Sequence, residues 1–138
     1  MVEIEVVGAA VLADVGDFYA RTGYGGGVSA SDVTLAAKLD GRVVGAVRLC
    51  RDGGFIVLRG MQVELALQRH GIGRSLLARC IPYLNRSTAY CLPYAHLEQF
   101  YGQAGFGRAD PAALPRFLRE RLAGYLSNSQ KVVGMCRP

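Results

Sequence analysis

The feature that most constrains this chain is the stretch VELALQRHGIGRSLL, residues 63–77. It begins as an apolar run typical of a strand, passes through a turn that contains Gly71 and Gly73, and continues with the apolar spacing of a helix. A strand, a glycine turn and a helix start leave main-chain N–H groups free at the positive end of a helix dipole. The two glycines let the main chain approach a diphosphate closely, because neither carries a Cβ atom. The stretch therefore predicts a phosphate-binding turn.

Strand and helix patterns alternate on both sides of this turn. The clearest is a hairpin, in which Asp40 and Gly41 form a preferred tight-turn dipeptide between strands 33–39 and 42–50. A long apolar strand at 55–67 follows, so three consecutive antiparallel strands lead into the turn. The remaining predictions are strands at 2–7, 88–92, from 106 and at 131–136, and helices at 9–22, 71–84, 95–103 and 111–126. With 138 residues, no internal repeat and no linker, one α/β domain over residues 1–138 is expected.

The charge pattern favours an anionic ligand over nucleic acid or a membrane. The net charge is +5, and every basic residue except Lys38 and Lys131 is an arginine, scattered along the chain. Such a surface either attracts an anion such as a nucleotide cofactor or is an ordinary solvated face. The chain lacks the basic-aromatic motifs of nucleic-acid binders and any apolar run long enough for a membrane span. The N-terminal segment has no early basic residues, as a signal or transit peptide would, so a cytoplasmic location is expected.

The cysteines do not predict a metal site. Cys50, Cys80, Cys91 and Cys136 show no paired spacing, and only two histidines accompany them, so no zinc ligand set can be assembled. Free, mostly buried thiols in a reducing compartment are expected. Cys91 is expected to lie close to the predicted site.

Two segments in order resemble a known family. Residues 68–73, QRHGIG, fit the pattern Gln/Arg-x-x-Gly-x-Gly/Ala, and residues 100–106, FYGQAGF, fit Phe-Tyr-x-x-x-Gly-Phe. Together they resemble the GNAT superfamily of acyl-CoA-dependent N-acyltransferases, most clearly over residues 33–106. The resemblance implies a single-domain α/β (α+β) fold: a mixed, mostly antiparallel sheet with helices on both faces. It also implies that the central strands, 55–67 and 88–92, splay apart and that acetyl-CoA binds in the opening.

By this resemblance, acetyl-CoA binds to the main chain of the opening stretch. The pantetheine would pair with residues 63–65 like an added strand, and the diphosphate would lie on the N–H groups of the turn. The predicted cofactor-binding residues are Val63, Glu64, Leu65, Gln68, Arg69, His70, Gly71, Ile72, Gly73, Arg74 and Tyr101. Arg69 and Arg74 either add charge to this site or are solvated surface arginines.

Acyl transfer to an amine requires a neutral amine, an oxyanion donor and a proton for the leaving thiolate. The resemblance makes the main-chain N–H of Val63 or Glu64 the oxyanion donor and Tyr101 the acid. The alternative for Tyr101 is a half-buried tyrosine that packs on Phe106. Glu64 is the candidate base, as the only carboxylate on its strand, but strand alternation directs it away from the position that relatives use. A bulge would re-aim it; otherwise a water chain carries the proton, and Glu64 is a solvated or salt-bridged residue.

The expected function is transfer of an acetyl group from acetyl-CoA to a primary amine. A small-molecule amine is the first choice, because the chain is short and has no evident peptide groove. Residues 14–29 and the segment after Phe106 are expected to shape the acceptor pocket, with the glycine tract 23–27 as a mobile loop and candidate cover. The alternatives are a protein N-terminal or lysine acetyltransferase, and a non-catalytic acyl-CoA-binding regulatory module. A monomer or homodimer is expected, without nucleic-acid or membrane partners.

Overall fold

The computed structural model describes residues 1–138 and contains a seven-stranded sheet in the order β1-β2-β3-β4-β5-β7-β6. The strands are β1 (Val2–Val6), β2 (Val33–Leu39), β3 (Arg42–Asp52), β4 (Phe55–Val63), β5 (Ala89–Cys91), β6 (Gly107–Arg108) and β7 (Met135–Arg137). The α-helices are α1 (Ala9–Thr22), α2 (Ile72–Leu84), α3 (Glu98–Gly102) and α4 (Arg116–Ser127). None of these helices has both the length and the apolar character that crossing a membrane requires.

The predicted mixed, mostly antiparallel sheet is confirmed. Every neighbouring pair of strands is antiparallel except β4 and β5, which run parallel. The predicted hairpin between β2 and β3 is present, and Asp40 and Gly41 have φ angles of 51° and 80°, as a tight hairpin turn requires. Gly53 and Gly54, with φ angles of 58° and 84°, make the next turn in the same way. The meander is one strand longer than predicted, because β1 pairs with β2 along its whole length.

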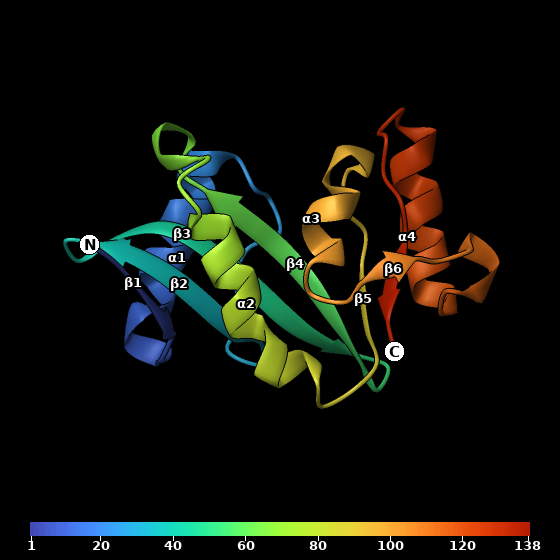
Figure 1. The fold of residues 1–138 in the computed structure, drawn as a ribbon, viewed down its shortest axis with the longest axis horizontal. Helices are drawn as coiled ribbons and strands as arrows, with labels where there is room; N and C mark the ends of the chain where they lie inside the picture. The colour runs from blue at the N-terminus through green and yellow to red at the C-terminus, as the bar shows by residue number, and fades with distance from the viewer.

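Helices cover both faces of the sheet, as predicted (Figure 1). On one face, α2 and α3 bury residues such as Leu76 and Tyr101 in a core shared with alternate strand residues, including Leu35. On the opposite face, α1 packs over Ala36 and its neighbours in β3, and α4 packs over Val57. The alternation of side chains along β2 and β4 therefore sorts the helices into two layers.

A bulge at Gly60 opens the sheet between β4 and β5. The register of β3 and β4 shifts by one residue between the pairs Ala46↔Gln62 and Arg48↔Arg59. Gly60 has a φ of 68°, in the left-handed region that favours glycine. β4 and β5 pair at only two positions, both near the beginning of β4. Beyond the bulge the two strands diverge, so the predicted splay of the central strands is confirmed.

The strand predicted at 55–67 is too long. Its ladder with β3 ends at the pair Gly45↔Val63, and the chain then forms the short 3₁₀ turn Leu65–Leu67. Past the splay this segment has a neighbouring strand on one side only, so little holds it extended. Leu67 still packs on the core, whereas Leu65 is 81% exposed. The apolar run thus contains both the end of β4 and the 3₁₀ turn, and its periodicity does not show where the strand ends.

Two other predicted elements are divided in the structure. Residues 95–103 form a 3₁₀ turn, Ala95–Leu97, followed by α3, and residues 111–126 form a 3₁₀ turn, Pro111–Ala113, before α4. The strand predicted at 131–136 is replaced by an isolated bridge between Tyr94 and Val132, and β7 follows. In each case contacts distant in sequence set the boundary.

Candidate functional site

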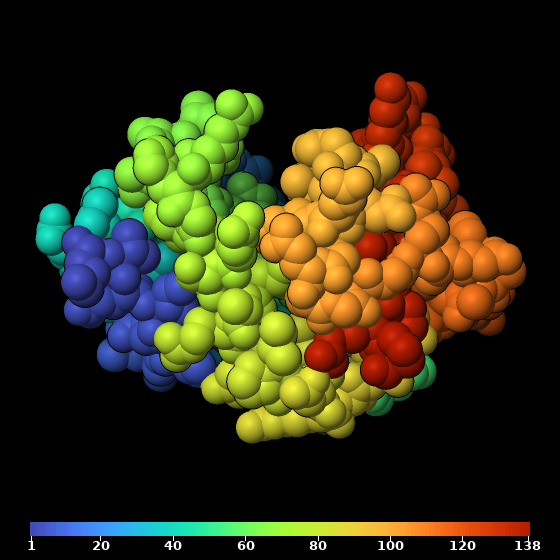
Figure 2. Space-filling model, viewed as in Figure 1, coloured from blue at the N-terminus to red at the C-terminus, as the bar shows by residue number.

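The opening between β4 and β5 contains two adjoining cavities. The larger, about 670 Å³, lies against α2 and α3 and is called the α2–α3 cavity below. The smaller, about 370 Å³, opens toward the opposite face, where its lining includes Tyr24, from the loop after α1, and Arg121 and Tyr125 of α4. It is called the α1–α4 cavity. Met61, Leu97 and Tyr101 line both. The cleft therefore passes through the sheet, and its outer mouth is the hollow between the β4–α2 region and α3 in Figure 2.

The turn between β4 and α2 presents a row of unused main-chain donors. None of the N–H groups of residues 69–74 donates a hydrogen bond to another main-chain group; the first such bond comes from Ser75, to the carbonyl of Gly71 at 3.0 Å. Arg69 and Gly71 have φ angles of 68° and 85°, which bend the chain into helix α2. Arg69 is the costlier of the two, because a side chain disfavours this region. The result is a concave set of amides at the positive end of α2.

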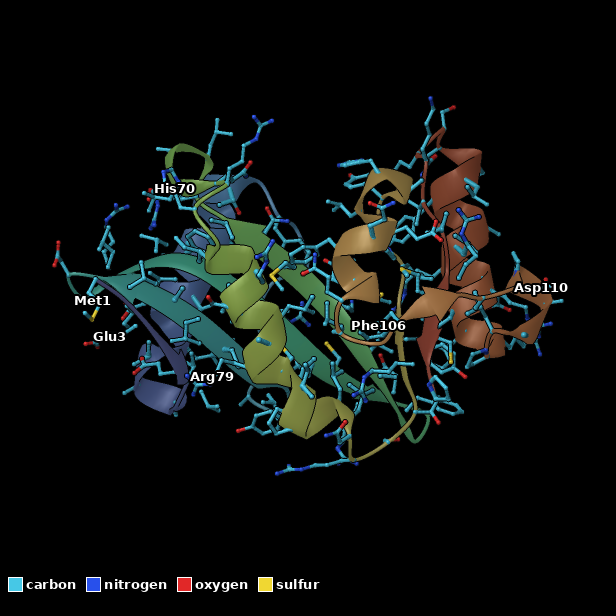
Figure 3. The ribbon with its side chains drawn as sticks, in the orientation of Figure 1. Met1, Glu3, His70, Arg79, Phe106 and Asp110 are labelled. Carbon is cyan, nitrogen blue, oxygen red and sulfur yellow. The ribbon has the colours of Figure 1, made fainter.

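Side chains of the loop hold this turn in shape. The Nδ1 atom of His70 lies 3.2 Å from the carbonyl oxygen of Leu67 and 3.0 Å from that of Gln68. The Nε2 atom of Gln68 donates to the carbonyl of Val63 at 3.1 Å. His70 lies in the loop that leads from β4 into α2, at the edge of the molecule (Figure 3). The loop is therefore held in shape by contacts of its own side chains.

Most of the predicted cofactor-binding residues lie together. Those that line the α2–α3 cavity are Val63, Gln68, Arg69, Gly71, Ile72, Gly73, Arg74 and Tyr101. Glu64, Leu65 and His70 do not line it. The lining contains no carboxylate, and it combines free amides with the guanidinium groups of Arg69 and Arg74. This donor set fits a diphosphate, which accepts hydrogen bonds and carries negative charge.

The main chain of Val63, and not that of Glu64, faces the opening. The N–H of Glu64 donates to the carbonyl of Val44 in β3 at 2.8 Å. Successive residues of a strand direct their main-chain groups to opposite sides, so the N–H of Val63 points away from β3. Of the two predicted oxyanion donors, the Glu64 amide is already used within the sheet and the Val63 amide is not.

The Glu64 carboxylate is held in an ion pair outside both cavities. Its Oε1 atom lies 2.6 Å from Nη1 of Arg42. The hydrogen bond from Arg42 lowers the pKa of the Glu64 carboxyl, with a smaller opposing effect of burial. A carboxylate with a lowered pKa accepts a proton less readily. This geometry matches the salt-bridged alternative for Glu64, and we assign it no role as a base.

Tyr101 stands where the two cavities meet. Its ring packs edge-on against Phe100 and Phe106, with centroid separations of 5.0 and 6.3 Å, and it is 6% exposed. Burial raises the pKa of its hydroxyl, and the nearby Cys91 and Cys80 thiols add to the effect. The hydroxyl is therefore protonated at neutral pH. Tyr101 therefore both packs on Phe106 and lines the cleft.

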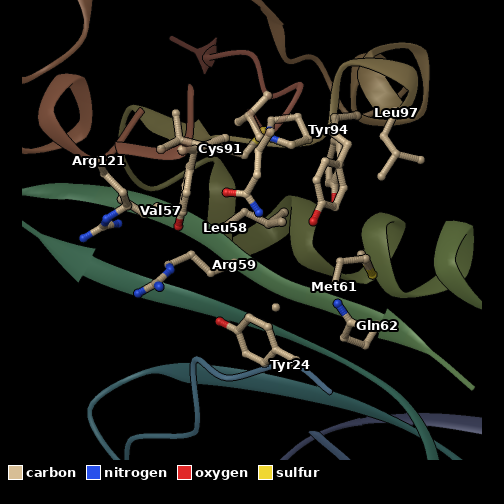
Figure 4. A pocket seen from close by; sticks show the side chains of 17 residues that line it. Tyr24, Val57, Leu58, Arg59, Met61, Gln62, Cys91, Tyr94, Leu97 and Arg121 are labelled. Atoms are coloured by element: carbon tan, nitrogen blue, oxygen red, sulfur yellow. The ribbon is translucent and has the colours of Figure 1, made fainter. Parts of the chain in front are cut away.

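The α1–α4 cavity contains side chains from three distant parts of the chain (Figure 4). Tyr24 comes from the glycine loop after α1, and Arg121 and Tyr125 come from α4. The glycine loop is fastened to the sheet: Nη1 of Arg48 donates to the Tyr24 hydroxyl at 2.8 Å and to the Gly26 carbonyl at 3.2 Å. The segments expected to shape an acceptor pocket, 14–29 and beyond Phe106, both contribute to its walls.

Sequence reasoning assigned no function to the two arginines of this cavity, Arg59 and Arg121. Arg121 is one of the scattered arginines, for which the charge pattern predicts either an anion-attracting surface or a solvated face. Its spacing contains a signal, because Arg121 lies three residues after the buried Leu118 and four before Tyr125, on the apolar stripe of α4. Arg59 lies two residues after the buried Val57 on the same face of β4, so strand alternation places its side chain on this side, but the sequence does not show that Arg121 lines the same cavity.

Cys91 lines the α1–α4 cavity but is a poor nucleophile. Burial raises the pKa of its thiol well above the usual range, with a further contribution from Cys136. The reactive form of cysteine is the thiolate, so this thiol is inert near neutral pH.

Solved structures of acyltransferases share this architecture. An N-acetylglutamate synthase from Neisseria gonorrhoeae, solved with coenzyme A and N-acetyl-glutamate, gives a TM-score of 0.69 at 19% identity over 99% of this chain, which spans only 35% of that chain. The ribosomal-protein-S18-alanine N-acetyltransferase of Escherichia coli gives 0.70 at 16% identity, covering 100% of this chain and 94% of that one. An acyl-CoA N-acyltransferase from Pseudomonas aeruginosa gives 0.71 at 19% identity, covering 100% and 99%. At such identities these likenesses establish the fold. No curated protein sequence matches significantly.

A family model described as an acetyltransferase (GNAT) domain matches residues 26–116. The matched segment contains the splayed strands β4 and β5, the turn with its free amides, and Tyr101. It covers well over half of the sequence. The chain belongs to the GNAT acetyltransferase family of acyl-CoA-dependent N-acyltransferases.

Proposed function

We propose that the protein transfers an acetyl group from acetyl-CoA directly to the primary amine of a small molecule. The observation that carries the proposal is the row of free amides at residues 69–74, which opens into a cleft that passes through the sheet. Such a cleft admits a donor from one face and an acceptor from the other. The size of the acceptor side, about 370 Å³, suits a small amine.

The α2–α3 cavity is the donor side in this proposal. When bound there, acetyl-CoA supplies the thioester whose acetyl group is transferred. The amides of residues 69–74 hold its diphosphate, and Arg69 and Arg74 add positive charge. Val63, whose amide faces the opening, pairs with the pantetheine or donates to the thioester oxygen. Glu64 and Leu65 were also predicted to pair with the pantetheine, and we propose no such role for them.

The chemical step requires few groups from the chain. The nitrogen of the acceptor bonds to the acyl carbon and the carbon–sulfur bond breaks. The Val63 amide stabilises negative charge that develops on the thioester oxygen. Tyr101 donates a proton to the departing sulfur. The amine nitrogen gives up a proton as the new bond forms, and this proton returns to Tyr101 through solvent. The inert Cys91 thiol supports direct transfer over an acyl-enzyme route.

We expect the rate to follow the ionisation of the acceptor amine. No Asp, Glu or His side chain lines the α1–α4 cavity, so no general base acts there near neutral pH. Below the pKa of the amine, kcat/KM should rise about tenfold for each pH unit. Because the pKa of Tyr101 is raised above its usual value, its protonated form persists and no falling limb should appear below about pH 10. Measuring kcat/KM over this range with two amines of different pKa checks this, and a plateau common to both amines would reveal an enzymic base.

Replacing Gly71 with alanine tests the cofactor site. Gly71 lines the α2–α3 cavity, and a Cβ there would meet no protein atom within 4 Å, so it would occupy open space beside the free amides. We expect the Kd for CoA to rise about tenfold by isothermal titration calorimetry, since lost contacts with a charged group typically amount to about 1.5–3 kcal/mol.

Gly54→Ala is the matched control for this test. Gly54 has a φ of 84° against 85° for Gly71, and a Cβ there also meets no protein atom. Both variants should lose about 1–2 kcal/mol of stability to backbone strain, but only Gly71→Ala should lose affinity for CoA. Equal affinity in both variants, or no CoA binding by the unmodified protein, would contradict the proposed cofactor site.

A further inference from the structure

The α1–α4 cavity has charge of one sign only. Its lining includes two arginines, Arg59 and Arg121, and no Asp, Glu, Lys or His. The remaining polar groups are tyrosine hydroxyls and amides, including Tyr125 and Gln130. A cationic acceptor such as a polyamine would meet repulsion here and would find no carboxylate to receive its second charge.

Arg121 has hydrogen-bonding capacity that the protein does not use. Its Nη1 atom is buried and has no hydrogen-bond partner. Its guanidinium group lies over the ring of Phe117, 5.9 Å from the centroid, which supports the cation but satisfies no N–H group. A buried donor without an acceptor costs free energy, and a ligand with an acceptor in the right place recovers it.

Arg59 is likewise left without a counter-ion. It stands opposite Arg48 in the β3–β4 ladder, on the same face of the sheet. The nearby carboxylate, Asp32, is already paired with Arg48 at 3.0 Å, and the other ion pairs of the chain involve different residues. Figure 4 shows the guanidinium groups of Arg59 and Arg121 pointing to the same end of the cavity. Two half-buried like charges at one end of a cavity favour an anion between them.

We infer that the acceptor is an amino acid, whose carboxylate is bound by Arg59 and Arg121 while its amine faces Tyr101. This inference rests on the proposed acetyl transfer and specifies its substrate class. A carboxylate matches a guanidinium group in shape and charge and accepts bonds from both arginines. The amine then lies toward the junction of the cavities, where the donor cavity begins. The cavity volume of about 370 Å³ suits a free amino acid.

The test compares acceptors that differ only in the carboxylate. Free amino acids and their carboxamides, for example leucine with leucinamide and glutamine with its amide, are assayed by thiol release from acetyl-CoA. Rates are divided by the fraction of neutral amine at each pH, because the amides ionise differently. We expect kcat/KM for the preferred acid to exceed that of its amide by about tenfold to a hundredfold, as for loss of a charged hydrogen bond.

Substitutions at both positions, with one control, test whether the arginines cause this preference. Arg59→Gln and Arg121→Gln should each raise the KM for the amino acid at least about tenfold and so reduce the preference for the acid over its amide. Arg116→Gln is the control, because Arg116 lies on the same helix but its side chain is 85% exposed and paired with Glu120. It should behave as the unmodified protein. Arg59→Lys and Arg121→Lys, which keep the charge, should recover part of the preference.

The outcomes separate the two proposals. Equal rates for acids and amides, or faster reaction with amides or polyamines, would overturn the substrate class and leave acetyl transfer standing. If no acceptor reacts, calorimetry on the CoA-loaded protein decides the matter: amino acids that bind, with loss of binding in Arg121→Gln, support the class, and no binding overturns it. Failure to bind CoA would overturn the proposed function itself.

Discussion

Replacing Tyr101 with phenylalanine is expected to lower kcat by about a hundredfold or more and to change the KM for acetyl-CoA by less than about threefold. The hydroxyl is the only group that the change removes. It lies at the junction of the two cavities and keeps its proton near neutral pH, because burial raises its pKa. Steady-state kinetics with a saturating acceptor measure both constants.

The phenylalanine ring keeps the packing of Tyr101 on Phe106, so the midpoint of thermal unfolding should hardly change. Tyr83→Phe is the matched control, because Tyr83 lies on α2, lines neither cavity and loses the same group. Its kcat should equal that of the unmodified protein. If Tyr101→Phe also keeps its kcat, Tyr101 is a packing residue and the proton for the sulfur comes from elsewhere.

Local signals were enough to predict much of the fold. Helix α1 begins and ends as predicted, because glycines at positions 8 and 23 bound an amphipathic run, and Gly23 adopts a φ of 81° at its end. The β2–β3 hairpin follows from Asp40 and Gly41, whose preference for positive φ is a property of the residues themselves. The turn at 69–74 belongs to the same class, since a glycine after an apolar strand and before a helix is a local pattern.

The site depends more on contacts that no local pattern contains. Glu64 was considered as a base, but its partner Arg42 is 22 positions away in sequence and meets it only after β3 and β4 pair. Gly60 was one glycine in an apolar strand, and its bulge exists only relative to the register of β3. Arg59 becomes one of two arginines in a single cavity only because α4 places Arg121 there. The two arginines of the α1–α4 cavity therefore escaped prediction, whereas the glycine turn with its free amides did not.

Replacing Arg48 with methionine is expected to destabilise the fold by about 3–5 kcal/mol, the usual result of breaking a buried ion pair from one side. The side chains of Arg48 and Asp32 are 6% and 7% exposed, and Nε and Nη2 both lie 3.0 Å from Oδ2. Without Arg48, the Asp32 carboxylate would remain buried without a counter-ion, and the glycine loop would lose its bonds to Tyr24 and Gly26. Thermal unfolding should show a fall in Tm of roughly 10–20 °C.

A double-mutant cycle identifies the cause of this loss. Asp32→Asn combined with Arg48→Met removes the buried charge that has lost its counter-ion. The double variant should therefore be more stable than Arg48→Met alone. Arg116→Met, at an exposed ion pair on α4, is the control and should cost no more than about 1 kcal/mol. Because Arg48 also holds Tyr24 at the wall of the α1–α4 cavity, the proposed acceptor side, the double variant should keep its affinity for CoA while its KM for the acceptor rises. A double variant no more stable than Arg48→Met would mean that packing and loop contacts, and not the buried charge, account for the loss.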